Sequence, residues 1–392
     1  MDRQIPTPAK PASEPTVAVL PAAPDWPRGL LSERLRRLGV ELQRSCRAHV
    51  LFIGLVLAYG GVGAAVPPLF GAAPESDDLF FSAQFLRGNA GVLGVLALGY
   101  LVWVMAVVRP PQLARYLHKQ LRSRFLTAER IAAALPVLLL YPIFISASAA
   151  LKGVIPVIQP FAWDAQFAAW ENFLHGGRQP WEWLQPLFGH PYTTDAIDML
   201  YLAWFYVGGI VLFWQMLSLR RPRLRMQFFL SIVLIWVLLG NVAAVALSSA
   251  GPCYYGRVTG LPDPFAPLMD YLQGADDVVF LWALAVQEEL WKTYLDPSAG
   301  VLHGISAMPS LHVAAAFCYT LLGFAVSRLL GLALGLFTAV TLIGSVHLGW
   351  HYAIDGYAGM LGAYAIWRAV GLFLARPAIA RLLWGDSTTD LG

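Results

Sequence analysis

The chain has 392 residues, of which 57% are apolar and only 13% carry a charge. Soluble domains carry about 25% charged residues, so a water-soluble globule of this size is excluded and a multi-pass membrane protein is predicted. The net charge is only +3, and the basic residues lie between apolar segments, which argues against nucleic-acid binding. Three scattered cysteines exclude a disulfide framework.

The N-terminal region is polar and rich in proline. Residues 1–28 contain seven prolines and no apolar periodicity, which predicts a disordered tail. Residues 29–48 place leucines at helical spacing among five arginines. This pattern indicates an amphipathic helix at the membrane surface or, alternatively, an ordinary solvated helix. The predicted units are the tail and surface helix at 1–48, a transmembrane catalytic domain at 49–375 with its core at about 131–375, and a cytoplasmic tail at 376–392.

Apolar stretches predict about eight transmembrane helices, since a helix needs about 20 apolar residues to cross the hydrocarbon core. They are 49–71, 89–108, 131–151, 196–217, 226–249, 312–330, 332–349 and 356–374. The last three are the shortest and could be read as two, but Arg328 separates the first pair, and His351 with Asp355 separates the second. The predicted fold class is an all-α polytopic membrane protein with both termini on one side.

Basic residues divide unequally between the two sides of this predicted bundle. Of the 27 lysines and arginines, 22 fall on the side that holds both termini. The five on the opposite side are Arg87, Lys152, Arg178, Arg257 and Lys292. Because positively charged loops face the cytoplasm, we expect cytoplasmic termini. The preferred location is a bacterial inner membrane, with the opposite side facing the periplasm.

Two histidines and an aspartate gather on this opposite side in the last third of the chain. His312 opens the sixth predicted span, and His351 and Asp355 lie between the seventh and the eighth. A spacing of four puts His351 and Asp355 on one helix face. There the carboxylate would fix the imidazole tautomer and free the other ring nitrogen to attack. His312 would protonate the leaving oxygen.

A helix start next to these residues favours an anion. Pro309 and Ser310 precede His312, and free backbone N–H groups at a helix start, together with the Ser310 hydroxyl, can hold a phosphate. The set predicts phosphoryl transfer through a phosphohistidine.

Two other classes stay open. The spacing of His347, His351 and Asp355 could present three metal ligands along one helical stripe, and His347 is otherwise expected to line the pocket. The polar residues could also form the path of a transporter, although the first five spans carry almost no ionisable residues.

Both motifs resemble those of a known family. Pro-Ser-Leu-His at 309–312 and His-Tyr-Ala-Ile-Asp at 351–355 are similar to the second and third motifs of the type-2 phosphatidic acid phosphatase superfamily. The similarity is closest to inositol phosphorylceramide synthases and their bacterial relatives. The resemblance implies a six-helix core, a non-cytoplasmic site and no metal cofactor. It also implies that His351 is the nucleophile, Asp355 its orienting group, His312 the proton donor and Ser310 a phosphate ligand.

The resemblance therefore implies a metal-independent lipid phosphotransferase that acts on a sphingolipid or glycerolipid acceptor. Its partners would be membrane lipids: a phospholipid donor, and ceramide or diacylglycerol as acceptor. The alternative is a lipid phosphate phosphatase that uses water. No nucleic acid is expected, and no protein partner can be inferred.

Two positions depart from the family pattern. The arginine that often precedes the nucleophile by six residues is Ser345 here. The first motif, a lysine followed seven residues later by Arg-Pro, is not found on the predicted site side, since Arg221-Pro222 falls on the other. A phosphate in a low-dielectric pocket needs a cation, so Arg257 is the first candidate and Lys292 the second. Tyr254 and Tyr255 would line the same mouth. All four could instead be ordinary loop or interface residues.

Overall fold

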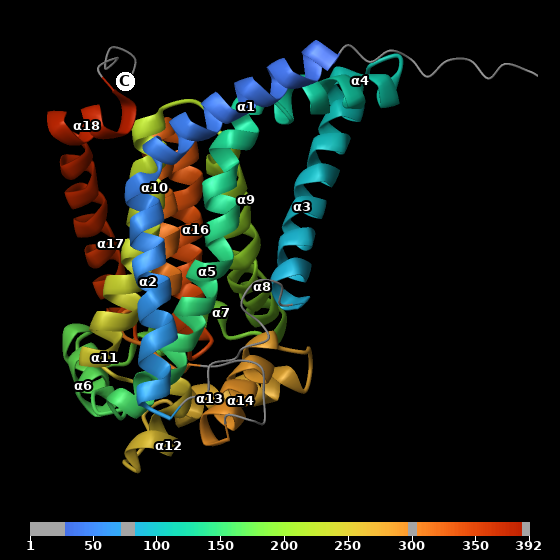
Figure 1. The fold of residues 1–392 in the computed structure, drawn as a ribbon. Helices are drawn as coiled ribbons and strands as arrows, with labels where there is room; N and C mark the ends of the chain where they lie inside the picture. The colour runs from blue at the N-terminus through green and yellow to red at the C-terminus, as the bar shows by residue number, and fades with distance from the viewer. Residues whose placement is uncertain (1–27, 72–82, 297–303, 386–392) are drawn as a thin grey trace, which may run out of the picture.

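The computed structural model describes residues 28–71, 83–296 and 304–385, and every regular element in these ranges is a helix (Figure 1). The predicted tail at 1–27 lies outside the described residues. Within these ranges, seven segments are long and apolar enough to cross a membrane, which confirms a polytopic all-α fold. They are α2 (Val50–Leu69), α3 (Ala83–Trp103) with η1 (Val104–Val108), α5 (Ala128–Ile158), α8 (Pro191–Leu202) with α9 (Trp204–Leu217), α10 (Pro222–Leu234) with η3 (Ile235–Ala243) and α11 (Ala244–Ala246), α16 (Arg328–His347), and α17 (Ala353–Leu374).

The sixth predicted span, 312–330, is a shorter helix inside the bundle. α15 (Leu311–Val326) has 16 residues, fewer than the roughly 20 that cross the hydrocarbon core alone. It packs against α16 and α17, and several of its side chains, including Val313, Ala314 and Leu322, are 0% exposed. Because neighbouring helices surround it, α15 does not have to match the thickness of the membrane.

One end of the bundle is basic and carries both ends of the described chain. α1 (Arg28–Ala48) lies across this end, together with α4 (Leu113–Gln120), η2 (Leu121–Phe125) and α18 (Pro377–Trp384) (Figure 1). The Arg47 guanidinium donates hydrogen bonds of 2.8 and 2.7 Å to the carbonyl oxygens of Arg381 and Leu382. The first and last described helices are therefore tied together.

Short helices cover the opposite end. The connections from α5 to α8 and from α11 to α15 contribute α6 (Asp164–Leu174), α7 (Pro180–Phe188), η4 (Pro252–Tyr254), α12 (Tyr255–Thr259), α13 (Ala266–Asp276) and α14 (Trp282–Leu295). They gather below the long helices in Figure 1. His312, His351 and Asp355 all lie at this covered end of the bundle.

Candidate active site

The two motif regions meet through their backbones. Ser310 is the N-cap of α15: its hydroxyl accepts from the Val313 N–H at 3.4 Å, and its own N–H donates to the Asp355 carbonyl oxygen at 3.0 Å. Gly359 of α17 packs so closely here that a Cβ on it would lie 2.6 Å from the Ser310 carbonyl oxygen. A glycine at this position lets the start of α15 lie directly against α17 and brings His312 beside the turn before α17.

His351 and Asp355 are in contact, but not because they share a helix face. α16 ends at His347 and α17 begins at Ala353, so His351 lies in the turn before the N-cap residue Tyr352. The expected geometry of two residues on one helix is therefore wrong. Asp355 instead reaches back from the first turn of α17: its Oδ2 accepts the Tyr352 N–H at 3.0 Å and lies 3.3 Å from His351 Nδ1. This is a capping-box arrangement.

Two further carboxyl groups surround the start of α17. Asp164 accepts the Tyr352 hydroxyl at 2.9 Å and the backbone N–H groups of Ala250 and Gly251. Glu171 accepts the Ile354 N–H at 3.4 Å. Burial raises the pKa of Asp164, and burial together with the Asp355 charge raises the pKa of Glu171 to about 8. The positive end of the helix dipole favours acidic groups at this position.

His312 is held by aromatic rings at the start of α15. Its ring stacks on Tyr201 with centroids 5.1 Å apart and lies 4.5 Å from the Trp204 ring. The Trp204 indole N–H donates to the His312 carbonyl oxygen at 3.0 Å. The His312 and His351 ring centroids are 6.3 Å apart. One phosphoryl group placed between the two imidazoles could contact both.

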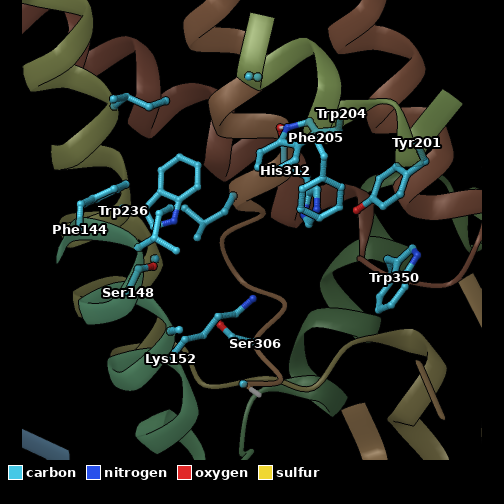
Figure 2. A pocket seen from close by; sticks show the side chains of 18 of the residues that line it. Phe144, Ser148, Lys152, Tyr201, Trp204, Phe205, Trp236, Ser306, His312 and Trp350 are labelled. Carbon is cyan, nitrogen blue, oxygen red and sulfur yellow. Dashed lines mark hydrogen bonds between the residues drawn. The ribbon is translucent and has the colours of Figure 1, made fainter. Parts of the chain in front are cut away.

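The two imidazoles line one end of a cavity of about 510 Å³. Lys152 of α5 lines the same end, and among the described residues around the cavity it is the one lysine or arginine. Figure 2 shows its side chain extending from α5 into the space that His312 and Trp350 border from other elements. Burial, aided by the Lys152 charge, lowers the pKa of His351 to about 3, while a backbone contact with Ala307 opposes the shift. This shift favours the neutral form of the His351 imidazole.

His347 faces away from this cavity. Its Nε2 lies 2.9 Å from the Thr194 hydroxyl, and its ring packs against Phe188 and Tyr271. Because α16 ends at His347, the metal-binding stripe with His351 and Asp355 does not form. Within the described ranges, no group of three or more His, Cys, Asp or Glu side chains is arranged to hold a metal ion.

The basic residues favoured from the sequence also lie away from the cavity. Arg257 is half exposed, lies 3.4 Å from Glu288 and covers the Trp291 ring. Lys292 is exposed on α14. Tyr255 is buried against Phe265 and does not line the cavity.

Ser310 is fully buried, and its hydroxyl oxygen accepts from the backbone of α15. It contributes to the position of His312, and it is not among the residues that line the cavity.

Sequence reasoning missed Lys152, although a signal for it is present. The residue is followed seven positions later by Gln159-Pro160. This differs from the family's first motif only in having glutamine for arginine. The helix α5 extends seven residues beyond the predicted span end at residue 151, to Ile158, and this extension carries Lys152 into the cavity wall.

Buried polar atoms at this end lack protein partners. In the described part of the chain, no hydrogen bond reaches Asp355 Oδ1, the Tyr201 hydroxyl or Trp350 Nε1. Tyr201 and Trp350 line the cavity beside the imidazoles. Buried polar groups are normally satisfied, so such a concentration is typical of a ligand site.

The fold is that of a multi-pass integral membrane protein, and the predicted site residues meet beside a cavity at one end of its helix bundle. The family model described as the PAP2 superfamily matches residues 165–369, and the chain belongs to this superfamily. The match includes both motifs and confirms the superfamily predicted from them. The chain is thus an enzyme of the general phosphatase or phosphotransferase type. No curated protein and no solved structure matches it.

Proposed function

We propose that this protein is a metal-independent lipid phosphotransferase, similar to inositol phosphorylceramide synthases, that works through a phosphohistidine on His351. The observation that supports this most is the shared cavity end: two imidazoles and one ammonium group meet there, and the rest of the cavity is largely apolar. A phosphate can be bound and attacked at this end, while a lipid tail occupies the apolar remainder.

The chemistry follows from the contacts of His351. Its Nδ1–H donates to Asp355 Oδ2, which leaves the lone pair on Nε2 free to attack phosphorus. An N–P bond forms, the P–O bond to the leaving group breaks, and His312 gives its proton to that oxygen. In the second step an acceptor O–H attacks phosphorus, the N–P bond breaks, and His312 takes the proton back.

Lys152 supplies the positive charge that the site needs. Charge builds up on the non-bridging phosphate oxygens in the transition state, and a fixed cation in a water-poor site stabilises it. Asp355 keeps the nucleophile in one tautomer, and Asp164 and Glu171 hold the backbone turn that carries it. Tyr201 and Trp350 offer unpartnered donors to a polar headgroup or to the acceptor alcohol.

The position of the basic end of the bundle indicates which side of the membrane the site faces. Arginine-rich α1, η2 and the start of α10 lie opposite the site, and positively charged ends of membrane proteins face the cytoplasm. We therefore place the reaction at the non-cytoplasmic face, with the periplasmic face of a bacterial inner membrane as the preferred setting.

The acceptor separates this proposal from its alternative, a lipid phosphate phosphatase. The purified protein in detergent is given phosphatidic acid alone, and phosphatidylinositol with ceramide, each with and without a chelator. Transfer to ceramide in chelator supports the phosphotransferase. Release of free phosphate as the one product, with ceramide present, would assign the phosphatase instead. Loss of activity in chelator would contradict metal independence.

The intermediate is tested with a matched pair of histidine variants. Brief incubation with donor labelled at phosphorus should leave acid-labile label on the wild type and on His190→Ala, an exposed histidine on the same side of the bundle. His351→Ala should carry no label and lose turnover. Turnover that survives in His351→Ala would rule out the phosphohistidine.

A further inference from the structure

The cavity continues from the histidines deep into the bundle. On α5 its wall includes Lys152, Ser148, Ile145, Tyr141 and Val137. These residues recur every three or four positions, so they form one face of the helix. From Lys152 to Val137 the wall is about 22 Å long, at 1.5 Å per residue.

The far end of the cavity lies near the basic end of the bundle. Phe52, the third residue of α2, lines it together with Phe228 and Phe229 from the first half of α10. Phe52 and Phe229 pack with ring centroids 5.5 Å apart and close the floor. Half of a hydrocarbon core is about 15 Å, so a cavity of this length passes the middle of the membrane.

The polar and apolar parts of the cavity are separated along its length. Lys152, Ser148, Asp198 and the two imidazoles line the covered end, whereas beyond Ser148 the walls are aliphatic and aromatic, with the phenols of Tyr141 and Tyr319 among them. The apolar part of the cavity is therefore suited to the hydrocarbon of a lipid, with the headgroup at the polar end.

The cavity is open near its polar end. Ala149 on α5 and Phe205 on α9 line it and are exposed, Phe205 by 59%. These two residues mark the side from which a lipid would enter.

We infer that the cavity is a slot that draws the hydrocarbon of the lipid phosphate inside the bundle, so that the enzyme selects its substrate by chain length. The headgroup end of this inference rests on the proposed function. The walls of the slot are about as apolar as lipid tails, so a longer chain gains little by moving from the bilayer into it. Selection therefore takes the form of an upper limit, set where the chain end reaches the Phe52 and Phe229 floor.

The limit is tested with single-chain alkyl phosphates of increasing length in mixed micelles. For the wild type we expect kcat/KM to stay level and then to fall at least about ten-fold beyond one length. Ile145→Trp fills the slot about 10 Å below Lys152, seven residues along α5, and should lower that limit. Leu139→Trp is the control, since Leu139 is 61% exposed on the same helix and does not line the slot. Equal profiles for the two variants, or no upper limit in the wild type, would overturn the inference.

A second measurement needs no turnover. A long-chain alkyl phosphate with a photoreactive diazirine at the chain end is cross-linked to the wild type and to His351→Ala. The expected labels fall on Phe52 and Phe229. Labels on the outer face of α5, at Leu138 and Leu139, would contradict a chain inside the bundle. If labels fall in the slot while no phosphate compound is turned over, the proposed chemistry fails and the slot stands.

Discussion

Buried charged side chains occur at both ends of the bundle, but their hydrogen-bond partners differ between the two ends. At the basic end, Arg225 is 7% exposed. Its guanidinium donates at 2.7 Å to the carbonyl oxygens of Gln215 and Ala133 and lies 2.8 Å from His49 Nε2. At the other end, Asp164, Glu171 and Asp355 accept backbone N–H groups around the start of α17. A cation thus meets the carbonyl end of α9, and acids meet the N–H end of α17, as helix dipoles favour.

The two clusters differ in what they leave unsatisfied. All three nitrogens of the Arg225 guanidinium have partners. The acid cluster leaves Asp355 Oδ1 without a hydrogen bond among the described residues and adjoins the open donors of Tyr201 and Trp350. Buried charge alone therefore does not mark a candidate reactive site, because the Arg225 cluster is fully hydrogen-bonded. The acid cluster is distinguished by polar atoms that lack hydrogen bonds and lie next to a cavity.

The largest expected effect is a loss of activity when the acid cluster is changed at Asp355. In Asp355→Asn the side chain can no longer stabilise positive charge on the His351 ring or fix its tautomer, so we expect kcat to fall about 10³-fold or more. The change is measured in the acceptor assay, with thermal unfolding in detergent as the stability readout. Asp270→Asn, an exposed acid on the same side, serves as control. Activity within ten-fold of wild type would remove Asp355 from the mechanism.

Lys152→Met should come next. Removal of the one lysine or arginine among the described cavity residues is expected to reduce kcat/KM about 10²-fold, and Lys152→Arg should restore part of it. Steady-state kinetics with a short-chain substrate measures both. If Lys292→Met showed the loss and Lys152→Met did not, the phosphate charge would be carried from α14 and not from α5.

Arg225→Met should affect stability in place of chemistry. It leaves several buried carbonyl oxygens and His49 without their donor, and each such group costs about 1–3 kcal/mol. We expect a loss of about 3 kcal/mol or more and a lower unfolding temperature, with kcat of the folded fraction retained. Arg223→Met, on the same helix, is the comparison. A large fall in kcat at unchanged stability would contradict a purely structural role for Arg225.

The smallest effect is a pH dependence at the acid cluster. The folded pKa of Glu171 is about 8 against an ordinary 4.5. Between these values the folded chain keeps a proton that the unfolded chain loses, so stability falls as pH rises. Glu171→Gln should remove this slope and raise the unfolding temperature near pH 8, with little change near pH 5. A slope that persists in the variant would assign it to another group, such as Asp164.

His49 gives the opposite sign at the basic end. Burial, with the Arg225 charge, lowers its pKa to about 4, so the unfolded chain binds the extra proton between about pH 6.5 and 4. Its contribution to stability is therefore lost as pH falls through that window. The two ends of the bundle consequently limit stability from opposite sides of the pH scale.

Composition and apolar runs were enough to predict the helical membrane fold, because a lipid environment leaves few other ways to satisfy the backbone. The details of the site were harder to predict. The predicted third span stopped at residue 151, because the charge of Lys152 ended the apolar run. In the structure, α5 continues to Ile158 and places that charge in the cavity. The contact of His351 with Asp355 was expected from helical spacing and arises from a helix cap instead, which periodicity does not reveal.

The close approach of Gly359 to the Ser310 backbone has a consequence for how such an enzyme can diversify. The reaction centre is fixed by main-chain contacts between α15 and α17, whereas the covering helices and the slot are built from exchangeable side chains. New headgroups or tail lengths can therefore be accommodated by mutations that never disturb the geometry of bond making. Laboratory evolution of acceptor preference should accordingly accumulate changes in α9, α10 and α14 and leave the two motifs untouched.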